Sequence, residues 1–235
     1  MTTVLAESHQ TFVFADIAGF TALTEAHGDE EGADLAESFS AEAEGVVREH
    51  HGEHVKTIGD ALMLRVGEPA AAVRMGLAIV LDLMTRHGSP AVRVGMHYGP
   101  AVERSGDWFG STVNLAARIS GLAVGGEVLL SEAARRAAGE IEGVHFVERG
   151  RQRLRNVSEP MTLYAARRQG ESSELGLPID PVCRMAVDPD QAAGQLTHEK
   201  VDYHFCSLEC AAAFAAAPHA HLQSNRSSGG TAEGG

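Results

Sequence analysis

The alternation of short apolar runs with longer amphipathic stretches is the feature that most constrains the fold of this chain. Between residues 11 and 168, runs such as TFVFADI and ALMLRV alternate with segments whose apolar residues recur three or four positions apart. Short apolar runs are typical of strands, and the spacing of three or four is typical of helices. The pattern therefore predicts an α/β or α+β domain.

The order of these elements narrows the choice. Two helices are expected between residues 19 and 50, with a break near His27 to Asp29, and the glycine and aspartate at 59–60 predict a tight hairpin turn. This order suits an α+β, ferredoxin-like βαββαβ core with extra C-terminal strands. Strands are predicted at 11–17, 54–58, 61–66, 91–99, 126–131, 144–149, 151–155 and 162–167, and further helices at 69–87, 110–122 and 131–139.

A change of composition divides the chain after this region. The segment QGESSELGLPID is rich in Gly, Ser, Glu and Pro, which is typical of a linker. The predicted organisation is a main domain at 10–168, a linker at 169–179, a small second unit at 180–222 and a disordered tail at 223–235.

Charge and hydropathy exclude several classes of partner. The formal net charge of −13 argues against sequence-independent binding of nucleic acid, so an anionic ligand must meet locally placed cations. No apolar run approaches the roughly 20 residues that cross a bilayer, and the first ten residues lack the order of a signal peptide. We expect a cytoplasmic protein with no membrane or nucleic-acid partner.

Two aspartates suggest a metal site. Asp16 ends a predicted strand and Asp60 lies at the predicted hairpin turn, so neighbouring strands could bring both carboxylates to a shared pair of ions. Carboxylates suit Mg²⁺ or Mn²⁺ bound together with substrate phosphates. The alternative is that Asp16 caps a helix beginning near Gly19 and Asp60 serves the turn.

Four further polar residues could meet a nucleotide. Lys56 precedes Asp60 by four residues, which would place both side chains on one face of a strand, and Lys56 with Asp107 could read a purine edge. Asn114 and Arg118 lie four apart on a predicted helix and could meet negative charge on phosphate. Taken singly, each residue also fits a solvent-exposed strand or helix face.

The three segments that carry these residues, FADIAGFT, VKTIGDALM and GDWFGSTVNLAARI, resemble the signature segments of class III nucleotidyl cyclases. The resemblance covers residues 10–168 and is strongest to the bacterial subclass with Asp at the specificity position. It implies roles for all six residues. Asp16 and Asp60, with the carbonyl of Ile17, would bind two Mg²⁺ or Mn²⁺ ions, Lys56 and Asp107 would select adenine, and Asn114 and Arg118 would position ribose and stabilise the transition state.

The resemblance also implies an activity and an assembly. The expected reaction is that of an adenylate cyclase, which converts ATP to 3′,5′-cyclic AMP and pyrophosphate in a head-to-tail homodimer with two sites at its interface. The segment RQRLRNVSEPMTLY resembles the family's closing segment, with Arg155, or else Arg151, as the contact to the terminal phosphates. The alternatives are a guanylate cyclase and a regulatory nucleotide-binding relative without catalysis.

The second unit resembles a YHS domain through DPVCRMAVDP and VDYHFCSLECAAAFAAAPHAHL. Its three cysteines suggest a second metal site for Zn, Cu or Fe. The alternative is that they are small buried apolar residues. The unit could modulate the cyclase, or could itself carry the main role as a metal carrier. The candidate ligands are Cys183, Cys206 and Cys210, with His204 or His198 as the fourth.

Overall fold

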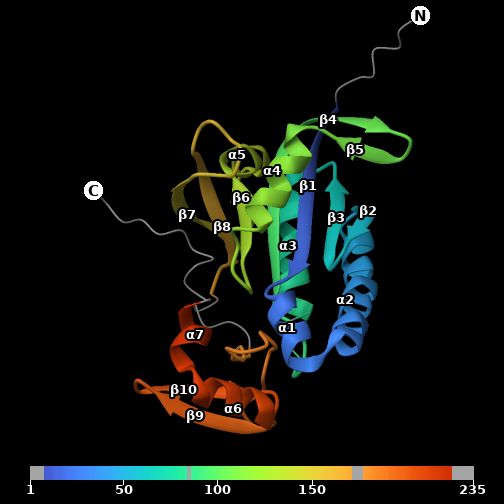
Figure 1. Ribbon diagram of the computed structural model, residues 1–235. Helices are drawn as coiled ribbons and strands as arrows, with labels where there is room; N and C mark the ends of the chain where they lie inside the picture. The colour runs from blue at the N-terminus through green and yellow to red at the C-terminus, as the bar shows by residue number, and fades with distance from the viewer. Residues whose placement is uncertain (1–7, 84–85, 171–176, 224–235) are drawn as a thin grey trace, which may run out of the picture.

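The computed structural model describes residues 8–83, 86–170 and 177–223, and an eight-stranded sheet dominates it (Figure 1). The strand order is β2-β3-β1-β4-β6-β8-β7, and β5 pairs with β4 beside this path. β4 and β6 are parallel, and the other neighbours are antiparallel. The strands are β1 (Ser8–Ile17), β2 (Glu53–Ile58), β3 (Ala61–Val66), β4 (Val92–Arg104), β5 (Asp107–Phe109), β6 (Val128–Ser131), β7 (Val144–Gln152) and β8 (Met161–Arg168).

The helices interrupt the strands in the predicted βαββαβ order, with two helices in the first crossover and one in the second. The α+β architecture with an extended sheet is therefore confirmed. The two helices of the first crossover separate at Gly28, as the sequence indicates. Ser131 caps α5 by accepting a hydrogen bond from the Ala134 amide at 3.2 Å. The helices of this part are α1 (Phe20–His27), α2 (Asp29–Glu49), α3 (Pro69–Leu83), α4 (Ser111–Ser120) and α5 (Glu132–Ala138).

The two faces of the sheet have different cover, because side chains alternate along each strand. Val13, Ala15 and Ile17 of β1 enter one large apolar cluster, to which α1, α2, α3 and α5 contribute. Phe12 and Phe14 point to the opposite face, where α4 is the described helix that packs on the sheet. This second face therefore carries two smaller apolar clusters, both of which include residues of α4.

Two local predictions need correction, and one strand was missed. The segment 151–155 is not a separate strand, because Arg151 and Gln152 end β7 beyond a bulge and the chain then turns. The helix expected to reach residue 87 ends at Leu83, with residues 84 and 85 outside the described part. β5 was not predicted, and it brings Asp107 back alongside Arg104.

The C-terminal unit lies at the end of the sheet where α1 is found (Figure 1). A loop leads into the hairpin of β9 (Gly194–His198) and β10 (Val201–Phe205), followed by α6 (Leu208–Ala216) and α7 (Pro218–Gln223). Phe205 and Phe214 are buried, and they belong to the same apolar cluster as the helices under the sheet. The unit is thus packed onto the rest of the protein.

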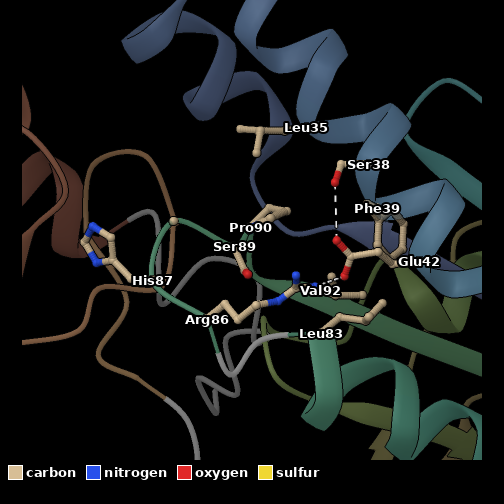
Figure 2. Close-up of a pocket in the computed structure, with 11 residues that line it drawn as sticks. Leu35, Ser38, Phe39, Glu42, Leu83, Arg86, His87, Ser89, Pro90 and Val92 are labelled. Carbon is tan, nitrogen blue, oxygen red and sulfur yellow. Dashed lines mark hydrogen bonds and ion pairs between the residues drawn. The ribbon is translucent and has the colours of Figure 1, made fainter. Parts of the chain in front are cut away.

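The connection before β4 holds this unit by backbone hydrogen bonds. The amide of Gly88 donates to the carbonyl of Ala186 at 2.9 Å, and the amide of Ala186 donates to the carbonyl of Ser89 at 2.8 Å. Figure 2 shows Arg86 and His87 pointing in opposite directions, Arg86 toward Glu42 of α2, with which it forms an ion pair, and His87 away from it. The His87 Nδ1 accepts a hydrogen bond from the Asp188 amide at 3.1 Å.

Several expectations concern residues that the structure does not describe. The middle of the predicted linker, 171–176, and the predicted tail from residue 224 onward lie outside the described residues. The domain boundaries at 10–168 and 180–222 stay predictions. Among the described helices, none combines the length and the apolar character needed to span a bilayer.

A close approach between α4 and β4 fixes the position of α4. A Cβ atom on Gly95 would lie 1.9 Å from the Ser120 amide nitrogen, and one on Gly99 would lie 2.8 Å from Thr112 Oγ1. The backbone of α4 therefore sits directly on β4, at a distance that only glycine allows at position 95. The position of the α4 backbone relative to β4 is therefore fixed.

We predict that Gly95→Ala lowers the free energy of unfolding by at least about 1–3 kcal/mol, because the added methyl group must push backbone away. Gly45→Ala is the matched control, since nothing lies within 4 Å of a Cβ there and the residue is inside α2. The control should be neutral or stabilise by roughly 0.5–1 kcal/mol. Urea unfolding measures both, and equal effects of the two substitutions would contradict the close approach.

Candidate active site

Asp16 lies near the end of β1 on the face that α4 covers. In the antiparallel register it is directly opposite Arg93 of β4. The Arg93 guanidinium donates two hydrogen bonds to the carboxylate, from Nε to Oδ1 at 2.5 Å and from Nη2 to Oδ2 at 3.1 Å. The side chain of Asp16 is 16% exposed and that of Arg93 is 24% exposed, so the pair is partly buried.

Asp60 lies in the two-residue turn between β2 and β3, where Gly59 has a φ of +64°. Asp60 is at the turn, as predicted, but the prediction that it shares a strand face with Lys56 is wrong, because β2 ends at Ile58, two residues before Asp60. The pairing of β3 with β1 brings this turn beside the end of β1.

The pKa of Asp16 reports the proximity of these charges. Burial raises the pKa of Asp16 above its ordinary value, the Arg93 guanidinium lowers it, and the negative charge of Asp60 raises it further. Two carboxylates that repel each other in a partly buried position form a donor set that a hard divalent cation stabilises. Asp16 and Asp60 therefore fit the predicted metal site.

Ile17, whose carbonyl is the third predicted metal ligand, follows Asp16 directly. Its side chain is 1% exposed and belongs to the large apolar cluster on the opposite face of the sheet. Only the backbone of Ile17 is thus available for a ligand on the Asp16 face.

The side chains of Lys56 and Asp107 are in contact within one chain, although the residues are far apart in the sequence. The Lys56 ammonium donates to Asp107 Oδ2 at 2.6 Å, and Asp107 Oδ1 accepts from the Trp108 amide at 2.8 Å. The hydrogen bond from Lys56 is the main cause that lowers the pKa of Asp107. The two side chains are 40% and 31% exposed, which leaves donor and acceptor capacity for a ligand.

Asn114 is exposed and Arg118 half-buried on α4, with the buried residues Val113 and Ala116 facing the sheet. Within the described residues, neither polar side chain has a hydrogen-bond or ion-pair partner. Arg155 is also exposed, and its neighbour Leu154 packs in a cluster with Ile119 of α4. Arg155 therefore follows a segment that is anchored beside α4.

Arg151 is engaged elsewhere. Its Nη2 donates to the carbonyl of Pro160 at 3.3 Å, across the β7–β8 connection. Of the two basic candidates for phosphate contact, Arg155 is therefore the one with a free side chain among the described residues.

The structure thus holds two separate groups of predicted residues. Asp16 and Asp60 lie together, and Lys56 lies with Asp107, but within the described part of the chain no hydrogen bond or ion pair joins the first group to the second or to α4. Arg93 belongs to the first group and was missed. A single arginine in the apolar run AVRVGMHYG, opposite Asp16, was the signal that could have found it.

The three cysteines lie together, as expected for a metal site, but the histidine beside them is His27 and not one of the two predicted histidines. Sulfur atoms of Cys183, Cys206 and Cys210 and a ring nitrogen of His27 all lie within 4.8 Å of one another. His204 and His198 are not in this group, and each has a buried ring nitrogen without a hydrogen-bond partner. The fourth member is therefore supplied by α1, which sequence spacing gave no means of finding.

Comparison with known proteins agrees with the fold. Residues 5–167 match the family described as the adenylate and guanylate cyclase catalytic domain. A pH-sensitive adenylate cyclase of Mycobacterium tuberculosis is 38% identical over 164 residues, which are 67% of this chain and 40% of that protein. An adenylate cyclase of Streptomyces coelicolor is 36% identical over 120 residues, 51% of this chain and 32% of that protein.

Solved structures resemble the chain in fold. The adenylyl cyclase CyaB of P. aeruginosa has a TM-score of 0.61 at 22% identity, over 72% of this chain and 97% of that one. A Trypanosoma brucei adenylate cyclase in its monomeric state has a TM-score of 0.64 at 23% identity, over 70% and 92%. The chain spans less than half the length of the curated relatives named above.

Proposed function

Since the chain belongs to the adenylate and guanylate cyclase catalytic domain family, we propose that it is an adenylate cyclase that acts as a homodimer. In the proposed reaction the ribose 3′-oxygen of ATP bonds to the α-phosphorus, the bond to the bridging oxygen breaks, and pyrophosphate leaves with that electron pair. The proton of the 3′-hydroxyl passes to water. The products are 3′,5′-cyclic AMP and pyrophosphate.

The Lys56–Asp107 pair is the observation that carries the choice of substrate. Adenine presents a ring-nitrogen acceptor beside an amino donor, and the pair offers an ammonium donor beside a carboxylate acceptor. Guanine presents a ring N–H donor and a carbonyl acceptor at that edge, the reverse order. Because the two side chains hold each other at 2.6 Å, their order is preset before a nucleotide arrives.

Asp16 and Asp60 are the proposed metal ligands, together with the carbonyl of Ile17. When bound there, two Mg²⁺ or Mn²⁺ ions lower the pKa of the 3′-hydroxyl and neutralise phosphate charge. Arg93 keeps Asp16 oriented through two hydrogen bonds and adds a cation at the place where a triphosphate would approach. Arg155 supplies a further exposed cation for the terminal phosphates.

Asn114 and Arg118 are proposed to meet the ribose and the charge that develops on the α-phosphate. Their side chains project from the side of α4 that is not packed on the sheet, and both keep their donors for a ligand. Since α4 is fixed on β4 by the contact at Gly95, the backbone positions that carry both side chains are set before the reaction.

The lack of a hydrogen bond or ion pair between the two groups, within the described residues, supports the proposed homodimer. Metal ligands of one chain would face Lys56, Asp107, Asn114 and Arg118 of the other, and two-fold symmetry would make two equivalent sites. Two large apolar side chains flank Lys56 and Asp107, and both Ile58 and Phe109 are 51% exposed. Exposed apolar groups beside polar site residues are typical of a surface that a partner covers.

We predict that the full chain forms cyclic AMP and pyrophosphate from ATP with Mn²⁺, and that Asp60→Asn lowers the rate on the order of 100-fold or more. Loss of a metal carboxylate removes several kcal/mol of charge stabilisation in the transition state. Asp34→Asn, which changes an exposed acid on α2, is the control and should leave the rate unchanged. No product from the wild type would favour the regulatory alternative.

We further predict that exchanging the pair, in Lys56→Asp/Asp107→Lys, lowers the ratio of kcat/KM for ATP to that for GTP by roughly 10- to 100-fold. The exchange keeps an ion pair but reverses donor and acceptor. The control exchanges the exposed pair Glu132 and Arg136 on α5, which should leave the ratio as it is. A wild type that prefers GTP, or an unchanged ratio in the exchanged variant, would contradict the assignment.

A further inference from the structure

Four metal-binding side chains converge where the C-terminal unit meets α1. Cys206 is at the centre of the group: its sulfur lies 3.3 Å from that of Cys183, 3.7 Å from that of Cys210 and 3.5 Å from His27 Nε2. Three of the four come from the C-terminal unit, and His27 is the last residue of α1. The group therefore bridges two parts of the chain that are far apart in sequence.

The spacing of the donor atoms suits a tetrahedral ion. A zinc–sulfur bond of about 2.3 Å with tetrahedral angles separates the sulfurs by about 3.8 Å. The sulfur separations at Cys206 are within about 0.5 Å of that value, and all four donors fit within 4.8 Å. A cluster of this size needs little movement to close around one ion.

The surroundings hold the donors in place. The buried Asp180 accepts hydrogen bonds from the amides of Val182 at 2.8 Å and Cys206 at 2.9 Å, which ties the two cysteine loops together. The other ring nitrogen of His27, Nδ1, lies 3.7 Å from Glu31 Oε1. This separation is that of an ion pair rather than a hydrogen bond, and a carboxylate behind a ligand histidine is a common arrangement at metal sites.

Burial makes uncompensated thiolates costly, and a cavity borders the site. Cys183 is fully buried and Cys210 is 2% exposed, so charged sulfurs there require a cation. A cavity of about 550 Å³ lies beside the group, lined by Ala22 and Ala26 of α1 and by Cys210 and Ala213 of α6. The cavity therefore borders the cluster at Cys210.

We propose that His27, Cys183, Cys206 and Cys210 bind one Zn²⁺ in a closed Cys₃His site that fastens the C-terminal unit to α1. Three soft thiolates and one imidazole are a donor set that zinc prefers, and four protein ligands leave no open position for catalysis. The site is structural. It offers an otherwise small unit the metal cross-link that its limited core calls for.

The position of the site gives it a consequence for the catalytic domain. The residue after Cys183 is Arg184, whose side chain lies over Gly19 in the turn between Asp16 and α1. The Arg184 carbonyl accepts a hydrogen bond from the Ala91 amide at 3.1 Å, two residues before Arg93. Zinc would thus brace both segments that carry Asp16 and Arg93. An effect on turnover rests on the proposed function.

Zinc titration of the metal-free, reduced full chain tests the site without any activity assay. We expect one equivalent bound, tetrahedral thiolate absorption on Co²⁺ substitution, and an affinity about tenfold or more lower in His27→Ala. His27→Cys should restore binding with a changed cobalt spectrum. His204→Ala is the matched control and should bind as the wild type does.

Hydrogen exchange gives a second, independent reading. Zinc removal should speed exchange of the Ala91 amide by roughly tenfold or more, because its acceptor lies beside Cys183. This measurement does not depend on cyclase activity. The proposal is overturned if the wild type binds no Zn²⁺ or takes only Cu⁺. It is also overturned if Cys183 and Cys206 form a disulfide that zinc does not prevent, or if His27→Ala binds zinc as tightly as the wild type.

Discussion

The pairing of β1 with β3 on one side and β4 on the other is the constraint on which the site depends. Because both registers are antiparallel and fixed, Asp16 lies opposite Arg93 and beside the turn that carries Asp60. A shift by one residue would turn Asp16 into the apolar cluster on the other face and leave its charge unpaired. The burial of the apolar side chains fixes this register, and the same register brings Asp16, Arg93 and Asp60 together.

The second constraint is the seating of α4 on the same sheet. Its backbone touches β4 at Gly95, so the backbone positions of Asn114 and Arg118 are fixed relative to the strands. On the opposite face, α1 connects the Asp16 turn to the cysteine cluster through His27. The catalytic domain and the C-terminal unit thus contribute to one apolar cluster, and they also meet where His27 lies beside the cysteines.

Much of this could be predicted from the sequence, because alternation and helical spacing are local signals. The strand ending at Asp16, the hairpin at Gly59 and the helix bearing Asn114 lie where expected. Arg93 was missed because one arginine in a strand resembles a solvent-exposed residue until its cross-strand neighbour is known. The place of His27 beside the cysteines depends on tertiary packing, which no spacing encodes, and β5 is too short for a periodic signal.

The central claim is that each site is divided between two chains, and mixing two inactive variants tests it most directly. Asp60→Ala and Arg118→Ala should each form almost no cyclic AMP alone. After co-expression in equal amounts, half of the dimers are mixed and each mixed dimer keeps one intact site, so about a quarter of wild-type activity should return. A mixture that stays inactive, although mixed dimers form, would contradict the account, as would substantial activity in either variant alone.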